Sequence, residues 1–301
     1  MNGKATELRY NQLIQSPRLD HDLWARPNLE TFRLRHIKMY EAIETYLEGA
    51  RDSIVDIGCQ NGFFLRLASE LGFKRFVAVD YFVLEDKRSF LSELAGVEFV
   101  RSNFNEDNFL RVLADESQDV VVSTEVVEHI CHHPLGYLRE CWRVLRHGGL
   151  LLLSTPNPTT LVNAVRLALG KEISWGSMAF AETPKLGPDG LPVAMWDIHF
   201  REYTHEILSD IVGKLDGAEI VERGFLANAP SSSEPLSKRL ALSIVSGVAP
   251  LSGWRPLCAT QYMIRQTALI VPGASPGHPT EANCNRSGPA ALTLIGSINN
   301  I

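Results

Sequence analysis

The stretch Ile54–Phe64, IVDIGCQNGFF, decides the fold class of this chain. It begins as a short apolar run that contains an acid, Asp56, and continues through Gly58 and Gly62 into a helical pattern. Because glycine has no side chain, the backbone can turn sharply at these positions and approach a ligand closely. A second apolar run, Phe76–Asp80, also ends on an acid, which can accept hydrogen bonds from both hydroxyls of a ribose. The pattern therefore predicts a loop that binds a nucleotide-type cofactor.

Short apolar runs alternate with helical patterns on both sides of this loop. The apolar runs are Ser53–Ile57, Phe76–Val79, Val97–Val100, Asp119–Ser123, Leu150–Ser154, Glu219–Phe225 and Tyr262–Val271. The helical patterns cover Leu29–Leu47, Phe63–Leu71, Leu84–Leu94, Asn108–Leu113, Pro134–Leu145, Leu161–Leu169 and Thr204–Leu215. Such alternation predicts an α/β fold, Rossmann-like and doubly wound, with a mostly parallel sheet and an N-terminal helix. Ligands of these folds bind at the carboxyl ends of the strands.

The composition of the flanking segments predicts the domain boundaries. Residues 1–28 are polar and are expected to form an irregular lead-in, and residues 29–271 one catalytic domain. Within it, residues 171–198 lack periodicity but contain Trp175, Phe180 and Trp196, which favours an acceptor lid over a solvated linker. Residues 272–301 are rich in glycine, proline, serine and asparagine, so we expect a disordered tail.

Charge and cysteine content limit the location and the partners of the protein. The net charge is −6 over 301 residues, which disfavours a nucleic acid partner. The N-terminus has no apolar signal segment, no apolar run is long enough to span a membrane, and the five cysteines form no C-x-x-C pair. These features predict a cytoplasmic protein without a membrane span.

Two classes of cofactor fit a glycine loop followed by an acidic strand end. A dinucleotide-binding loop requires G-x-G-x-x-G, and Gln60 and Phe63 interrupt that spacing. In addition, Asp56 would repel a pyrophosphate but would suit a ligand that carries a positively charged amine. The amino acid end of S-adenosylmethionine is such a ligand. The loop thus favours S-adenosylmethionine over a nicotinamide dinucleotide.

From about Ser53 to Phe225 the chain resembles the class I S-adenosylmethionine-dependent methyltransferases. The resemblance rests on IVDIGCQNG, FVAVD (76–80), VEFVRSNF (97–104), DVVVSTEVVEHI (119–130) and LRECWRVLRHGGLLLLSTPNP (138–158). It implies a seven-stranded sheet and S-adenosylmethionine as cofactor.

The same resemblance assigns the residues that would bind the cofactor. Asp56, Gly58 and Gly62 would line its methionine moiety, Asp80 would hold the ribose, and Asn103 would lie beside the adenine. The expected cofactor site also includes Phe104 and Glu125. Two positions depart from the family pattern, because Gln60 stands where a third glycine is frequent and Asn103 where aspartate is frequent. An asparagine side chain can still accept a hydrogen bond from the adenine amine.

The run Glu125–His129, EVVEH, contains the residues that point to chemistry. On a helix, residues three and four apart share a face, so Glu125, Glu128 and His129 are expected to converge. With His199, which follows the predicted lid, they form a candidate ligand set for a divalent cation such as Mg²⁺. Class I methyltransferases that bind no metal also contain this motif, and there His129 or His199 would be the general base.

The nature of the methyl acceptor is predicted from the C-terminal half. STPNPTTL and the segment that begins HFREYTHEIL (199–208) resemble methyltransferases of polysaccharide and secondary-metabolite synthesis, and more loosely ubiquinone-type O-methyltransferases. The expected reaction is O-methylation of a sugar or small-molecule hydroxyl. Four alternatives stay open: N- or C-methylation, metal-dependent RNA 2′-O-methylation, a nicotinamide-dependent oxidoreductase, and a scaffold without catalytic activity.

Overall fold

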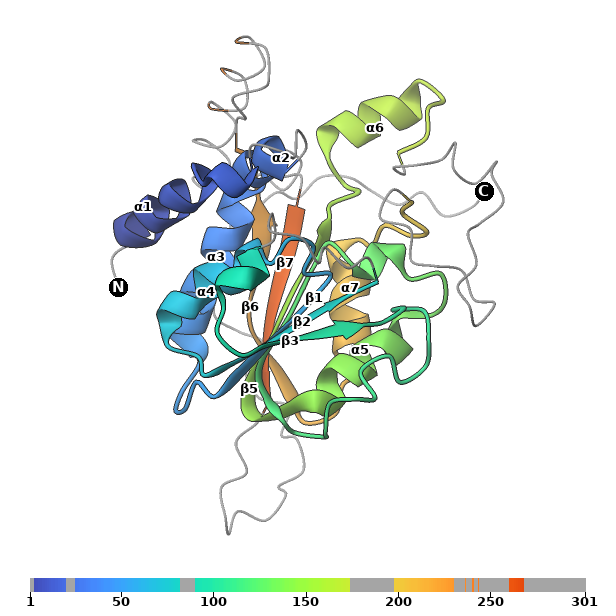
Figure 1. Ribbon diagram of the computed structural model, residues 1–301. Coiled ribbons are helices and arrows are strands. Elements are labelled where there is room, and N and C mark those ends of the chain that lie inside the picture. Colours follow the sequence, from blue (N-terminus) through green and yellow to red (C-terminus); the bar gives the residue numbers. More distant parts are fainter. Residues whose placement is uncertain are drawn as a thin grey trace, which may run out of the picture. The chain divides into compact units, whose positions relative to one another are not determined.

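The structure is a computed structural model that describes residues 3–19, 25–81, 90–173, 198–229 and 260–267, and residues 236, 240 and 243. Seven strands form one sheet in the order β3-β2-β1-β4-β5-β7-β6 (Figure 1). The first five strands in that order are parallel, and β7 runs antiparallel to both β5 and β6. Their bounds are β1 Ser53–Ile57, β2 Arg75–Asp80, β3 Val97–Arg101, β4 Gln118–Thr124, β5 Leu145–Pro156, β6 Ala218–Leu226 and β7 Thr260–Thr267. The predicted Rossmann-like, mostly parallel sheet is confirmed.

Helices cover both faces of the sheet, as its buried central strands require. The α-helices are α1 Gly3–Ile14, α2 Ala25–Thr31, α3 Arg33–Tyr46, α4 Phe63–Ala68, α5 Pro134–Val144, α6 Leu161–Ala168 and α7 His205–Val212. Short 3₁₀ turns are η1 Pro17–Leu19, η2 Ser69–Leu71, η3 Phe90–Glu93 and η4 Val127–His129. One buried cluster joins α1, α3 and α4 to one face, and a second joins α5 and α7 to the other.

The lead-in was predicted to be irregular, and that prediction is wrong for α1 and η1. The ring of Tyr10 on α1 packs edge-on against Phe63, with 5.0 Å between the ring centroids. Its hydroxyl donates a hydrogen bond of 2.6 Å to the carbonyl oxygen of Leu29. These contacts tie α1 to the helix that follows the glycine loop.

Two predicted helices also differ in the structure. The single helix expected over Leu29–Leu47 is interrupted at Phe32, which separates α2 from α3. The helix expected over Asn108–Leu113 is a series of turns, with backbone hydrogen bonds from Arg111 to Asn108 and from Leu113 to Leu110. The predicted lid, apart from its first three residues and Ile198, and the predicted tail lie outside the described residues, as does most of Leu84–Leu94.

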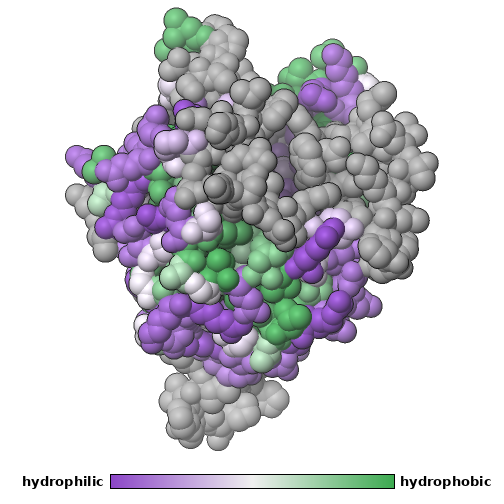
Figure 2. All heavy atoms as spheres, in the orientation of Figure 1, coloured by the Kyte–Doolittle hydropathy of each residue, from purple (hydrophilic) through white to green (hydrophobic). Residues whose placement is uncertain are grey.

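Helix α6 follows β5 and has no buried residue. Apolar side chains gather at the upper right of Figure 2, where α6 lies in Figure 1. The exposed ones of α6 and the residue after it are Leu161, Val162, Val165, Leu167 and Leu169. Among the described residues, every helix is too short or too polar to cross a bilayer.

Candidate active site

The predicted site residues meet at the carboxyl ends of β1, β2 and β4. Strands β1 and β4 are neighbours, and the chain order reverses between them. Loops that leave such a switch point diverge to opposite faces of the sheet, so a space for a ligand opens between them. Asp56 lies within β1, Asp80 ends β2, and Glu125 follows β4 directly.

The glycine loop has the geometry that the sequence predicts. Gly58 and Gly62 have φ angles of +75° and +74°, in the left-handed region that side chains disfavour. A Cβ atom on Gly58 would lie 2.7 Å from Val126 Cγ2, and one on Gly62 would lie 2.3 Å from Leu91 Cδ2. Both positions therefore require glycine for backbone conformation and for space.

Asp80 is connected to this loop through Gln60. The backbone N–H of Gln60 donates a hydrogen bond of 2.8 Å to Asp80 Oδ2. Gln60 has a φ of +47°, which is uncommon for a residue with a side chain. Since a carboxylate accepts several hydrogen bonds, Asp80 can hold the loop and still receive ribose hydroxyls.

Asp56 is buried in the centre of the sheet and its carboxyl group has an altered pKa. Burial and the nearby Asp80 charge raise this pKa, the Arg35 charge lowers it, and together they bring it to about 8. A buried acid in this state is stabilised as a carboxylate by a positively charged partner. The amine of an amino acid ligand would be such a partner.

Arg35 of α3 belongs to this region, and the sequence patterns did not single it out. It is 8% exposed although its residue type is rarely buried. Its Nη1 lies 3.2 Å from Glu125 Oε1, and its guanidinium carbon lies 4.2 Å from the centre of the Phe32 ring. Nε and Nη1 are buried without a hydrogen-bond acceptor. The available signal was a charged residue on the apolar face of an amphipathic helix.

Asn103 and Phe104 follow β3 and lie in the core rather than on an open surface. Asn103 is 2% exposed, and its Oδ1 accepts a hydrogen bond of 3.1 Å from the backbone N–H of Asn105. Phe104 packs edge-on against Phe109 at 5.7 Å. Their predicted place beside an adenine stays a prediction.

The sequence predicted that Glu125 shares a helix with Glu128 and His129, but in the structure it does not. Its φ of +54° is left-handed, and only Val127–His129 form a short 3₁₀ turn. The side chain of Glu125 accepts a hydrogen bond of 3.0 Å from Ser154 Oγ and faces Arg35. The predicted convergence of the three residues on one helix face is therefore wrong in its geometry.

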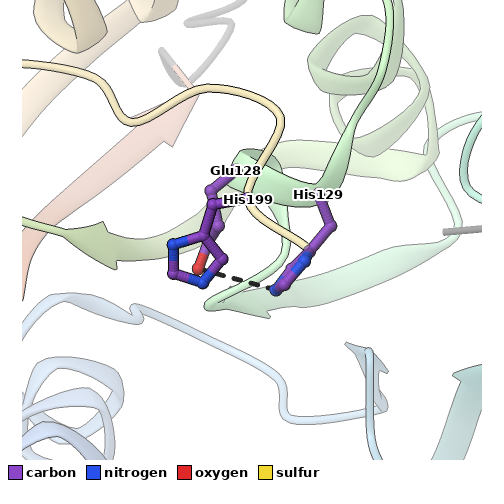
Figure 3. A group of neighbouring side chains, drawn as sticks. All are labelled: Glu128, His129 and His199. Carbon is purple, nitrogen blue, oxygen red and sulfur yellow. Dashed lines mark ion pairs between the residues drawn. The ribbon is translucent and has the colours of Figure 1, made fainter. Parts of the chain in front are cut away.

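Glu128, His129 and His199 do come together, in the arrangement shown in Figure 3. Each offers one potential ligand atom, and the three atoms lie within 4.8 Å of one another. His129 Nε2 is 3.9 Å from Glu128 Oε1, and the two imidazole rings meet edge to face with 4.9 Å between their centroids. The structure thus groups three of the four residues predicted as metal ligands and leaves Glu125 outside.

Neighbouring groups orient all three side chains. The carbonyl oxygen of Ile198 accepts a hydrogen bond of 2.7 Å from His129 Nδ1, and Glu202 Oε1 accepts one of 3.0 Å from His199 Nδ1. Each Nδ1 therefore carries the hydrogen, and the lone pair is on Nε2. Thr155 Oγ1 donates to Glu128 Oε2 at 2.9 Å. Histidines that bind metals are held by this type of outer contact, which the sequence patterns did not reveal for Glu202.

The electrostatics of Glu128 favour a cation at this position. Glu128 is fully buried, and burial together with the Glu125 charge raises the pKa of its carboxyl group. Glu128 Oε1 is buried without a hydrogen-bond donor. Two imidazole nitrogens and one carboxylate oxygen are a suitable ligand set for a divalent transition metal, whereas Mg²⁺ prefers oxygen ligands. The residues present therefore fit a divalent cation.

Comparisons with known proteins show what the chain is similar to. Residues 55–153 match a family model described as a methyltransferase domain. A probable S-adenosylmethionine-dependent methyltransferase of Mycolicibacterium smegmatis is 32% identical over 127 residues, which are 42% of this chain and 46% of that protein. The mitochondrial ubiquinone biosynthesis O-methyltransferase of Dictyostelium discoideum is 26% identical over 167 residues, 48% of this chain and 50% of that protein.

A solved S-adenosylmethionine-dependent methyltransferase from Mesorhizobium loti shares the fold. Its TM-score is 0.50 at 14% identity, and the match covers 76% of this chain and 96% of that one. The chain spans about half the length of the curated relatives it matches.

The fold and the glycine loop define a Rossmann-like domain whose loop has the geometry of nucleotide-type cofactor sites. More specifically, residues 55–153 match a methyltransferase domain, and the chain is similar there to S-adenosylmethionine-dependent methyltransferases.

Proposed function

We propose that this protein transfers a methyl group from S-adenosylmethionine to a hydroxyl of a small-molecule or sugar acceptor. The observation that carries the proposal is the juxtaposition of a glycine loop between two acids, Asp56 and Asp80, with the Glu128–His129–His199 group at the same edge of the sheet. One region provides a cofactor site and the other provides groups that activate a hydroxyl.

The residues around the loop would each bind one part of the cofactor. Asp80 would accept hydrogen bonds from the ribose hydroxyls, and Asp56 would face the ammonium group of the methionine moiety. Arg35, with buried N–H groups that have no acceptor, would receive the carboxylate of that moiety. S-adenosylmethionine supplies an activated methyl group, so the protein has mainly to orient the acceptor and exclude water.

The Glu128–His129–His199 group would activate the acceptor hydroxyl. Glu128 Oε1, His129 Nε2 and His199 Nε2 are the atoms that would hold a divalent cation. Such a cation lowers the pKa of a bound hydroxyl. If activity is independent of metal, Nε2 of His129 or of His199 would take the hydroxyl proton directly, because its lone pair is not used by the outer contacts.

Support for a hydroxyl acceptor comes from the histidine group and from the names of relatives, which include O-methyltransferases of ubiquinone biosynthesis. The net charge of −6 disfavours an RNA acceptor. N- or C-methylation would use the same cofactor site and differs only in the acceptor.

The first test is calorimetric titration of the full chain with S-adenosylmethionine, S-adenosylhomocysteine and NADH, followed by an acceptor screen with labelled S-adenosylmethionine. We expect both sulfur compounds to bind, NADH not to bind, and label to appear on a hydroxyl oxygen of a sugar or small molecule. Binding of NADH alone would show an oxidoreductase, and binding of none of the three would show a scaffold. Label on RNA, or on a nitrogen or carbon atom of a small molecule, would show that the acceptor is not a small-molecule or sugar hydroxyl.

The second test concerns the metal. Replacement of His199 with alanine is expected to weaken Mn²⁺ binding at least about 10-fold, because one of three ligands is lost. Glu202→Gln should weaken it less, because it removes only the group that orients His199. His147→Ala is the matched control, because His147 is exposed and pairs with Glu116. Equal Mn²⁺ affinity of the wild type and His199→Ala, measured by titration calorimetry, would rule out this metal site.

A further inference from the structure

An ion pair between Arg35 and Glu125 lies between the proposed cofactor site and the proposed metal site. Arg35 comes from α3, whereas Glu125 follows β4 and lies two residues before η4, which contains Glu128 and His129. The distance between Arg35 Nη1 and Glu125 Oε1 is 3.2 Å, and their side chains are 9% and 19% exposed. A buried pair of this kind excludes most of the solvent that would screen its charges.

The ion pair leaves part of the hydrogen-bonding capacity of the Arg35 guanidinium unused. Nε and Nη1 of Arg35 make no hydrogen bond that satisfies them, although both atoms are buried. Glu125 Oε1, in contrast, accepts a hydrogen bond of 3.0 Å from Ser154 Oγ in addition to facing Arg35. Buried N–H groups that lack an acceptor are costly, so a ligand carboxylate that supplies two oxygens to them would bind favourably.

Glu125 is also close to the metal group without belonging to it. The two carboxylates accept hydrogen bonds from adjacent residues of β5, Glu125 from Ser154 Oγ and Glu128 from Thr155 Oγ1. The ligand atoms that lie within 4.8 Å of one another nevertheless come from Glu128, His129 and His199 alone among the described residues. The Glu125 side chain is instead directed to Arg35 and Ser154.

We propose that Arg35 couples the two sites. The carboxylate of the bound cofactor forms an ion pair with the guanidinium of Arg35 in place of Glu125. The released Glu125 then becomes the fourth protein ligand of a divalent cation. The proposal rests on the proposed function, since it requires both the cofactor and the cation. The exchange preserves charge balance, because one carboxylate replaces another beside Arg35. The released Glu125 then adds a negative charge to a cation site that previously had one.

This arrangement makes the binding of cofactor and cation cooperative. A ligand shifts an equilibrium only by its differential affinity for two states, and here the states are Glu125 paired with Arg35 and Glu125 turned to the cation. Coupling of binding energies is reciprocal, so the factor by which the cofactor tightens metal binding equals the factor by which metal tightens cofactor binding. The acceptor would then meet a complete metal site only after the methyl donor is bound.

The experiment measures Mn²⁺ affinity of the full chain by electron paramagnetic resonance of free Mn²⁺. The affinity is determined for the protein alone, with saturating S-adenosylhomocysteine, and with saturating 5′-methylthioadenosine, which lacks the amino acid part. We expect Mn²⁺ binding to tighten about 10-fold with S-adenosylhomocysteine, within the usual range of coupling energies, and to stay unchanged with 5′-methylthioadenosine. Calorimetry should give the same factor for S-adenosylhomocysteine binding with and without Mn²⁺.

Two variants locate the coupling in the ion pair. In Arg35→Met and in Glu125→Gln, saturating S-adenosylhomocysteine should no longer change the Mn²⁺ affinity. Arg33→Met is the matched control, because Arg33 lies on the same helix but pairs with Glu7, and it should keep the 10-fold effect. Circular dichroism at each ligand concentration confirms that every variant is folded.

The outcomes separate the coupling from the function. Equal Mn²⁺ affinity with and without S-adenosylhomocysteine would overturn the coupling and leave the methyltransferase proposal intact. An equal effect of 5′-methylthioadenosine would overturn the role of the carboxylate, and persistence of the effect in Arg35→Met would overturn the role of Arg35. Failure of Mn²⁺ to bind under any condition would overturn both the coupling and the metal site, and failure of S-adenosylhomocysteine to bind would overturn the proposed function.

Discussion

Replacement of Asp80 with alanine is expected to weaken the binding of S-adenosylhomocysteine at least about 100-fold. A carboxylate that accepts hydrogen bonds from two ribose hydroxyls contributes about 1.5–3 kcal/mol for each bond, and about 1.4 kcal/mol corresponds to a tenfold change in affinity. The alanine variant also loses the acceptor for the backbone N–H of Gln60, which adopts a left-handed conformation in the glycine loop. Both losses act in the same direction, so this is the largest expected effect on ligand binding.

Two further variants make the measurement interpretable. Asp80→Asn keeps an acceptor for the Gln60 N–H and lowers only the strength of the ribose bonds, so its affinity should fall between those of the wild type and Asp80→Ala. Glu98→Gln is the matched control, because Glu98 lies on neighbouring β3 and pairs with Arg75 at the surface. Calorimetry that gives Asp80→Ala an affinity within threefold of the wild type would show that the ribose lies elsewhere.

The sheet could be predicted because its strands are buried on both faces. All five residues of β1 are buried, as are the first six of β4, and such strands appear in a sequence as short apolar runs. The order of the strands was not predicted, and no local pattern places β7 between β5 and β6, antiparallel to both. The seven predicted strands all occur, although β5 begins earlier, at Leu145, than the patterns indicated.

The N-terminal helices could not be predicted in the same way. Helix α1 is held by the contacts of Tyr10 with Phe63, Leu29 and His36, by a hydrogen bond from Arg9 to Tyr40, and by the burial of Ile14. Those partners are remote in sequence, so local periodicity contains little signal for the helix. At the break between α2 and α3, the Phe32 ring lies beneath the guanidinium of Arg35.

Sequence spacing identified most members of the candidate site but not their geometry. Glu125, Glu128 and His129 were grouped by helical spacing, yet the left-handed backbone at Glu125 turns its side chain to Arg35. A glutamate rarely adopts a positive φ, so the sequence gives no reason to predict this backbone conformation at Glu125. Arg35 itself resembled any charged residue of an amphipathic helix, and only its burial among carboxylates distinguishes it.

The stability of the protein without ligand is expected to depend on pH through Asp56. Burial and the Asp80 charge raise the pKa of the Asp56 carboxyl to about 8, whereas an aspartate in the unfolded chain has a pKa of about 3.9. Between these values the unfolded chain releases a proton that the native protein retains, so the contribution of this group to stability is complete below about pH 3.9 and is lost as the pH rises through about 8. The slope for one group is about 1.4 kcal/mol per pH unit.

Replacement of Asp56 with asparagine should therefore remove this dependence. From pH 5 to pH 8, the free energy of unfolding of the wild type should fall relative to that of Asp56→Asn by an amount on the order of 4 kcal/mol. Urea unfolding of both proteins at several pH values measures the difference, and Asp107→Asn, at an exposed position, serves as the control. Parallel curves for the wild type and Asp56→Asn would show that Asp56 has no raised pKa in the native protein.

The same carboxyl group should report on the ligand. If the ammonium of S-adenosylhomocysteine lies against Asp56, the positive charge favours the carboxylate and lowers its pKa, so binding at pH 7 releases a proton from the protein. Calorimetry in buffers of different ionisation enthalpy counts that proton, and the count should approach one in the wild type and zero in Asp56→Asn. If S-adenosylhomocysteine binds tightly to the wild type but releases close to zero protons, the ammonium group lies away from Asp56.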